Sequence, residues 1–250
     1  MGWPVDIIER PLTLPAEVLK IGADVYAYSI VDVDLTNGTT SDHVGTLLAL
    51  AVGYGITDDL EINTVMPTYQ IQLSPDGSAK GPLDLGLGYR VAHGAAGGRL
   101  KVAVRAVDGL QFGDSTTVRP LRIGAQVEFD VTPKFAVLSH DIGAGNFGVS
   151  VGLDGDVKPI FLTLPIGVAY QALPNLWVEA DTAIANSIKL KDASNVFISD
   201  QTPLDLTGVF TTLDGHLDVL GYVWFGDLQH AGDTWMIGAG IRYYVGRVGA

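Results

Sequence analysis

Three basic residues at alternate positions carry the most distinctive chemistry in this sequence. Arg99, Lys101 and Arg105 share one parity of the stretch RLKVAVRAV, and Leu100, Val102, Val104 and Ala106 occupy the other. Because alternate side chains of a β-strand point to opposite faces, the stretch predicts a strand with one cationic and one apolar face. A soluble sheet would expose the basic face to water, whereas a membrane barrel would turn it toward a wet interior. Alternation alone leaves both structures open.

Residues for catalysis are scarce. Ser139, His140 and Asp141 are consecutive, and neighbouring residues of a strand point to opposite faces, so they cannot form a nucleophile–base pair. The stretches GLDGDV and SPDGSAKG fall short of a calcium-binding loop and a phosphate-binding loop, and we expect both to be turns. The chain has no cysteine, which excludes disulfides and thiolate metal sites. We therefore expect no enzyme, no metal site and no cofactor.

The composition is apolar, but the apolar residues come in short pieces. Hydrophobic residues make up 47% of the chain and charged residues 17%. The richest run, VGTLLALAVGYGI, is interrupted by glycines and falls short of the ~20 apolar residues of a membrane helix. Transmembrane β-strands, at about 9–11 residues each, produce such a distribution. The net charge of −13 argues against binding to nucleic acid.

Alternation of period two recurs along the chain and predicts a single antiparallel β-barrel. We expect twelve strands, at residues 18–31, 43–56, 60–73, 82–92, 98–108, 118–131, from 135, 157–170, 175–187, 203–213, 216–226 and 233–246. Short turns alternate with longer connections (32–42, 74–81, 108–117, 141–156 and 188–202), so all the short turns would lie at one end. Outer-membrane barrels have short periplasmic turns, longer extracellular loops and an even strand number, and this asymmetry favours the membrane interpretation.

The two parities define two candidate sets of functional residues. The polar parity is predicted to line the lumen and to set its selectivity, through Arg90, Arg99, Lys101, Arg105, Arg122, Glu128, Asp130, Glu179, Asp181 and Arg242. Aromatic residues near the strand ends are predicted to lie at the membrane interface, namely Tyr54, Tyr89, Phe129, Tyr170, Trp235 and Tyr243. Opposed charges across the lumen would create a transverse field. Alternatively, the same charges form a lattice of salt bridges that blocks the pore.

The repeated hairpin of an aromatic residue, a tight turn and a leucine, above all GYGITDDLEI, resembles those of Gram-negative outer-membrane β-barrel proteins of porin-like architecture. The closing strand WMIGAGIRYYVG extends the resemblance over residues 18–246, although VGRVGA after Tyr244 departs from the usual terminal aromatic residue. The resemblance implies an up-and-down transmembrane barrel in the bacterial outer membrane, in contact with lipid.

We expect three parts: an N-terminal periplasmic extension (1–17), the barrel (18–246) and a C-terminal tail (247–250). The stretch RPLTLP has two prolines, so it is no central strand, and a short plug entering the barrel is the alternative to an extension. The expected function is passive diffusion of small polar solutes or ions through a narrow charged lumen. The sequence leaves the oligomeric state open and favours a monomer. The alternatives are a closed structural or adhesive barrel that acts through its extracellular loops, and a soluble ligand-binding barrel.

Overall fold

The protein is almost entirely β-structure. The computed structural model describes residues 4–33, 40–64, 69–72, 83–110, 121–139, 149–153, 159–189 and 202–246. Its strands are β1 (Leu19–Val33), β2 (Thr40–Gly55), β3 (Leu60–Thr64), β4 (Tyr69–Gln72), β5 (Leu83–Gly94), β6 (Leu100–Leu110), β7 (Leu121–Thr132), β8 (Phe135–Ser139), β9 (Val149–Leu153), β10 (Pro159–Leu173), β11 (Leu176–Lys189), β12 (Leu204–Thr212), β13 (Leu217–Phe225) and β14 (Trp235–Val245).

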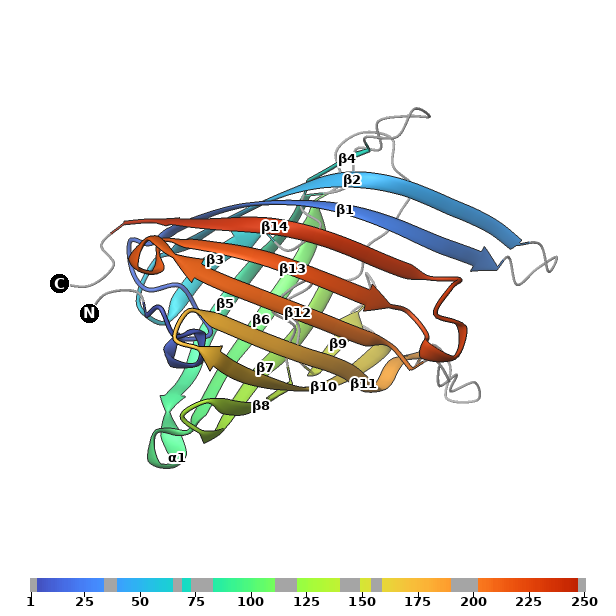
Figure 1. Cartoon of the computed structure of the whole chain (residues 1–250). Helices are drawn as coiled ribbons and strands as arrows, with labels where there is room; N and C mark the ends of the chain where they lie inside the picture. Colours follow the sequence, from blue (N-terminus) through green and yellow to red (C-terminus); the bar gives the residue numbers. More distant parts are fainter. Residues whose placement is uncertain are drawn as a thin grey trace.

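These strands close into an antiparallel barrel (Figure 1). β1 pairs with both β2 and β14, which joins the two ends of the sheet. β3 and β4 both pair with β2, and β8 and β9 both pair with β7 and β10, so each of these two pairs forms one crossing of the wall. The barrel therefore has twelve crossings, as predicted.

The predicted strands agree closely with the structure, with one clear difference. The connection expected at 141–156 contains β9, whose backbone pairs with β7 and β10. The sequence VSVGL does alternate, but it is only five residues long and is bounded by glycine-rich stretches, so its periodicity is weak. Part of the connection expected at 141–156 is therefore a strand.

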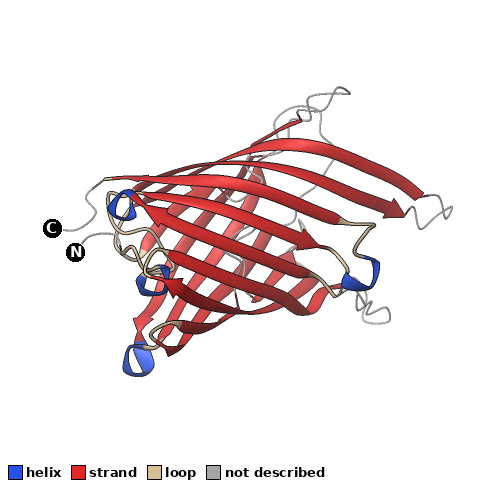
Figure 2. Cartoon of the chain, in the orientation of Figure 1, coloured by secondary structure: helices blue, strands red, loops and turns tan. Residues whose placement is uncertain are grey.

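The tight turns among the described residues lie at one end of the barrel, where β1 begins and β14 ends (Figure 1). They are the turns at 56–59, 133–134 and 174–175, the single-turn element α1 (Ala95–Gly98) and the 3₁₀ turn η2 (Leu213–Gly215). The opposite end includes the connection that carries η3 (Leu228–His230). Helices are confined to such short pieces, as Figure 2 shows, and none in the described part of the chain is long and apolar enough to cross a membrane.

The outward face is apolar all around the barrel, and this settles which face of the strand at 99–107 is inside. In β6, Val104 is 41% exposed whereas Arg105 is 6% exposed. Outward-facing aliphatic residues recur on every side, including Ile21, Val25, Leu50, Leu87, Ile123, Ile166, Val178, Leu206, Val219 and Ile241. An apolar surface of this extent is incompatible with water and matches the lipid-facing band of a transmembrane barrel.

Val25 offers a test of the lipid-facing band. It lies in the middle of β1, is 46% exposed and pairs with Ala239 and Leu48. We expect Val25→Lys to lower the free energy of unfolding from lipid vesicles by about 2–4 kcal/mol, because it places an ammonium in hydrocarbon. Denaturant titration followed by tryptophan fluorescence measures the change. Ile56→Lys, in an exposed turn, is the control, and an equal loss in both variants would contradict the membrane assignment of β1.

Candidate functional site

The barrel interior is lined by charged side chains that the strand alternation turns inward. Among the strand side chains that the structure describes, seven carboxylates are buried, on β1, β3, β7, β11, β12 and β13: Asp24, Glu61, Glu128, Glu179, Asp181, Asp205 and Asp218. Three cations of β6 and β14, Lys101, Arg105 and Arg242, are equally buried. Buried charges are stable only when they are paired or hydrated, so their arrangement decides what the interior can do.

Near the short-turn end the cations are paired with carboxylates. Lys101 Nζ lies 2.6 Å from Glu128 Oε1 on the adjacent strand. Arg105 Nη1 lies 2.6 Å from Glu61 Oε1, and Arg242 Nη1 lies 2.7 Å from Asp24 Oδ2. Charge-assisted pairs of this kind are roughly twice as strong as neutral hydrogen bonds, and they tie the walls together at this level.

Glycines on the inner face make room for these charges. Gly88 of β5 lies in register between Glu61 and Arg105, so the two side chains meet over a position that has no side chain. A Cβ at Gly88 would lie 3.0 Å from Glu61 Cγ, and one at Gly22 would lie 2.7 Å from Arg242 Cδ. A Cβ at Gly240 would overlap the Asp24 carboxylate. The high glycine content of these strands is therefore a steric requirement of the buried ion pairs.

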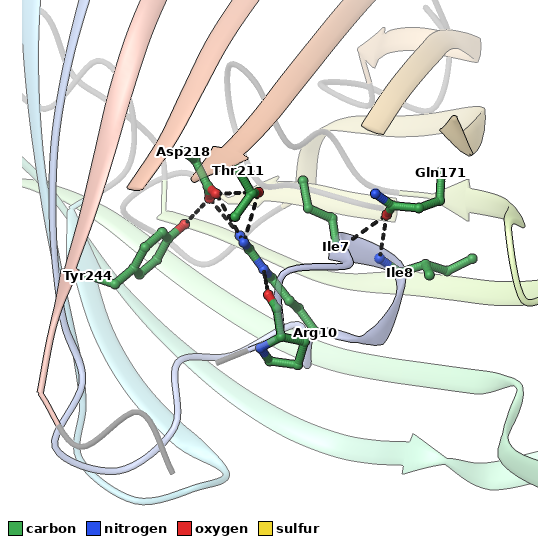
Figure 3. Close-up of polar contacts among 8 residues, drawn as sticks. Ile7, Ile8, Arg10, Gln171, Thr211, Asp218 and Tyr244 are labelled. Carbon is green, nitrogen blue, oxygen red and sulfur yellow. Dashed lines mark hydrogen bonds and ion pairs between the residues drawn. The ribbon is translucent and has the colours of Figure 1, made fainter. Parts of the chain in front are cut away.

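Arg10 brings the N-terminal segment into the interior (Figure 3). Its guanidinium donates to both carboxylate oxygens of Asp218, at 2.6 and 3.0 Å, and to the Thr211 hydroxyl at 3.1 Å. Asp218 also accepts hydrogen bonds from the hydroxyls of Thr211 (2.7 Å) and Tyr244 (2.9 Å). The guanidinium carbon lies 5.6 Å from the centre of the Tyr244 ring, within the range of a cation–π contact. Arg10 is 7% exposed.

Other contacts of the segment reach different walls. Gln171 Oε1 of β10 accepts from the backbone N–H groups of Ile7 (3.0 Å) and Ile8, and Figure 3 shows both bonds. On β6, Lys101 donates to the Ile8 carbonyl and Arg105 donates to the Leu12 carbonyl at 2.9 Å. Glu61 of β3 accepts from the Leu14 N–H at 2.7 Å.

The segment 7–14 thus contacts strands on several sides of the short-turn opening. The sequence analysis expected residues 1–17 to form a periplasmic extension. The contacts made by residues 7–14 lie on inward-facing side chains of the barrel strands, and the division between an extension and a plug stays a prediction. Buried polar groups of the barrel draw this part of the segment inside, because its backbone N–H and C=O groups satisfy them.

A second group of acidic side chains lies on strands other than those that carry most of the basic residues. Glu179, Asp181 and Asp205 lie on β11 and β12, and Asp181 and Asp205 are directly opposite in the register. The basic residues Lys101, Arg105 and Arg122 lie on β6 and β7, across the barrel in the strand order. Between these walls, β1, β2 and β13 contribute an apolar patch of Tyr26, Leu47, Ala49 and Tyr222.

The structure places most predicted lumen residues inside, with two exceptions. Arg99 is exposed in the turn after α1, just before β6 begins at Leu100. Because it precedes the strand, its side chain does not line the wall. Arg90 lies at the opening, where it pairs with Asp59 of the neighbouring turn at 2.7 Å. Arg122 and Asp130 are partly buried, and the remaining members are buried and face inward: Lys101, Arg105, Glu128, Glu179, Asp181 and Arg242. Their role in selectivity stays a prediction.

Five of the six predicted interface aromatics face outward near the short-turn end. Tyr54, Tyr89, Phe129, Tyr170 and Tyr243 are 39–51% exposed. Trp235 is the first residue of β14, so it lies at the opposite end and is partly buried. Phe210 of β12, which is 44% exposed, joins the first group and was not among the six predicted residues.

Sequence reasoning also missed Arg10 and Gln171. Arg10 precedes the first strand, in a stretch whose prolines break any alternation. A usable signal was present: Arg10 is a single cation among Ile7, Ile8, Leu12 and Leu14, an unusual composition for a solvated extension. None of the described residues form a group of three or more His, Asp or Glu side chains that could hold a metal ion.

Comparison with solved structures matches this architecture to porins. The KdgM porin superposes with a TM-score of 0.54 at 9% identity, over 89% of this chain and 98% of that one. The NanC porin superposes with a TM-score of 0.51 at 9% identity, over 88% and 98%. The chain has the fold of an outer-membrane porin. No protein-family model and no curated protein sequence matches it, so this likeness concerns the fold, and the predicted location in the bacterial outer membrane agrees with it.

Two glycines of this porin fold test the steric account of its interior. Gly240→Ala should lower the free energy of unfolding by about 1–3 kcal/mol, because the added methyl group displaces the Asp24 carboxylate from Arg242. Gly221→Ala is the matched control on β13, since a Cβ there meets nothing within 4 Å. Denaturant unfolding of the detergent-folded barrel measures both. Equal effects would show that the inner glycines serve only backbone flexibility.

Proposed function

We propose that the protein is a passive channel for small polar solutes or ions in the bacterial outer membrane. The observation that carries the proposal is a closed barrel with an apolar outer face and an inner face lined by charges from at least six strands. In a membrane such an inner face is stable when it is hydrated or paired. A barrel of twelve strands falls between the filled eight-stranded barrels and the open sixteen-stranded porins, so we expect a narrow lumen. Transport would run down a gradient without a chemical step.

The balance of charges favours cations. Among inward-facing strand residues whose side chains are described, the cations are Lys20, Lys101, Arg105, Arg122 and Arg242, and the carboxylates are Asp24, Glu61, Glu128, Asp130, Glu179, Asp181, Asp205 and Asp218. The pairs near the short turns neutralise most of the cations. Three of these carboxylates, Glu179, Asp181 and Asp205, lie together on β11 and β12 and are called the acidic wall here. A narrow lumen with low-dielectric walls concentrates counter-ions of the opposite sign.

The outward aromatic residues support the orientation in the membrane. Rings with polar tips are favoured at the headgroup level, and the exposed group near the short turns would mark the periplasmic interface. We propose this role for Tyr54, Tyr89, Phe129, Tyr170 and Tyr243, with Trp235 at the opposite interface.

Conductance through planar bilayers tests the channel and its selectivity together. We expect discrete current steps, and a reversal potential under a salt gradient that indicates preference for cations. Asp181→Asn combined with Asp205→Asn should shift that reversal potential toward zero, because two carboxylates of the acidic wall lose their charge. Asp214→Asn combined with Asp233→Asn removes two exposed charges from the connections and should leave it unchanged. If both double variants behave alike, the acidic wall does not set selectivity.

A closed structural or adhesive barrel is the second candidate, and the ion pairs at the short-turn end favour it. Lys101–Glu128, Arg105–Glu61, Arg242–Asp24 and Arg10–Asp218 link the walls and the N-terminal segment at this level. Protein that is folded and inserted but electrically silent, with and without residues 2–14, would favour this candidate over the channel.

A further inference from the structure

We propose that residues 7–14 form a displaceable plug of the short-turn opening and that Arg10 is its latch on Asp218. As a gate this rests on the proposed channel function, whereas the docking and release of the segment can be measured independently of conduction. The contacts of the segment, its mode of attachment and its composition carry the argument.

The barrel is built to receive the segment. Asp218 and Thr211 hold the Arg10 guanidinium through three hydrogen bonds, and the Tyr244 ring lies beside it. Gln171 offers one amide oxygen to two successive backbone N–H groups of the segment. These partners come from β10, β12, β13 and β14, so separate strands converge on one short stretch of chain.

The segment is attached in a way that permits release. Its permanent connection is a short backbone ladder at its C-terminal end, where Glu17 N–H donates to Gly55 O (2.8 Å) and Gly55 N–H donates to Val18 O (2.9 Å). Residues 4–16 pair with no strand, and their one regular element is the 3₁₀ turn η1 (Ile7–Glu9). Glu17 has a φ of 62°, so the chain reverses direction where it leaves the wall. A segment held at one end swings out when its far contacts break.

Arg10 is the strongest of the far contacts. Ile7 and Ile8 pack on an apolar cluster that includes Trp177 and Leu138, and Leu14 packs in a second cluster with Val18 and Tyr244 at the attached end. The other contacts of the segment are hydrogen bonds. The Arg10–Asp218 ion pair is buried on both sides, with side-chain exposures of 7% and 4%. Removing one partner of a buried pair leaves an uncompensated charge, which draws water into the contact and weakens the docked state.

The test uses a single introduced thiol, because the native chain has no cysteine. Ile8→Cys places the thiol where the native side chain is 4% exposed, and Glu9→Cys places it where the native side chain is exposed. Both proteins are reconstituted in vesicles and treated with a charged maleimide that reaches the short-turn opening. We expect the thiol at position 8 to react slowly and the thiol at position 9 to react fast. Adding Arg10→Gln should accelerate labelling of position 8 by at least about tenfold and leave position 9 unchanged.

Two further variants separate a latch from a general loss of structure. Arg99→Gln removes an exposed cation of a turn and should leave labelling at position 8 slow. Arg10→Asp combined with Asp218→Arg restores an ion pair of opposite polarity and should return part of the protection. Equal labelling of positions 8 and 9 in the native background would overturn docking. Continued protection of position 8 after Arg10→Gln would overturn the latch.

Conductance then tests the gate. Arg10→Gln and deletion of residues 2–14 should each raise the open fraction of the channel, and a synthetic peptide of residues 2–15, added on the short-turn side, should restore block to the deletion variant. Fast labelling together with unchanged conductance would overturn gating while leaving the proposed channel intact. Silence in every variant, with the labelling pattern as expected, would count against the channel and leave the latch standing.

Discussion

Backbone hydrogen bonding in lipid is the constraint on which this structure depends. A strand in hydrocarbon finds no water for its N–H and C=O groups, so a sheet that crosses a membrane must close on itself. Pairing of β1 with both β2 and β14 achieves that closure. Once the barrel is closed, alternation assigns every second side chain to lipid and the others to the interior. The distribution of polarity along each strand follows from this one requirement.

Closure has a second consequence, because it brings polar faces together in a confined space. The buried carboxylates and cations of the interior face one another across neighbouring strands or, for Arg105 and Glu61, across one intervening strand. Pairing them avoids the free-energy cost of isolated buried charge. Long side chains need volume, and glycines on adjacent strands supply it, as Gly88 does between Glu61 and Arg105. The many glycines and the inward charges of the sequence are therefore linked, because the glycines leave the space that the charged side chains occupy.

This coupling explains what could be predicted from the sequence. Strand positions, the count of crossings, the sorting of short turns and the inward parity of Lys101, Arg105 and Glu128 all follow from local periodicity, which a sequence displays directly. The partners of those residues do not, because Arg105 meets Glu61 across an intervening strand and register over two strands is not encoded locally. Arg99 shows where alternation stops being informative, because it lies in the turn before β6 and not in the strand itself. Arg10 lies outside any periodic pattern, so alternation could not place it in the interior, and only the apolar composition around it pointed there.

The N-terminal segment supplies a cation, Arg10, to one of the interior carboxylates. In the pairs within the wall, such as Lys101–Glu128, both partners belong to barrel strands. Asp218 is different, because the cation that hydrogen-bonds to it comes from outside the barrel strands. With Arg10 in place, the opening is crossed by chain and this carboxylate is neutralised. With Arg10 withdrawn, the carboxylate joins the acidic residues of β11 and β12 and makes the lumen more negative. Closing the opening and reducing the negative field are thus a single event at one ion pair, so a plug held this way would change both the flow and the selectivity of the channel.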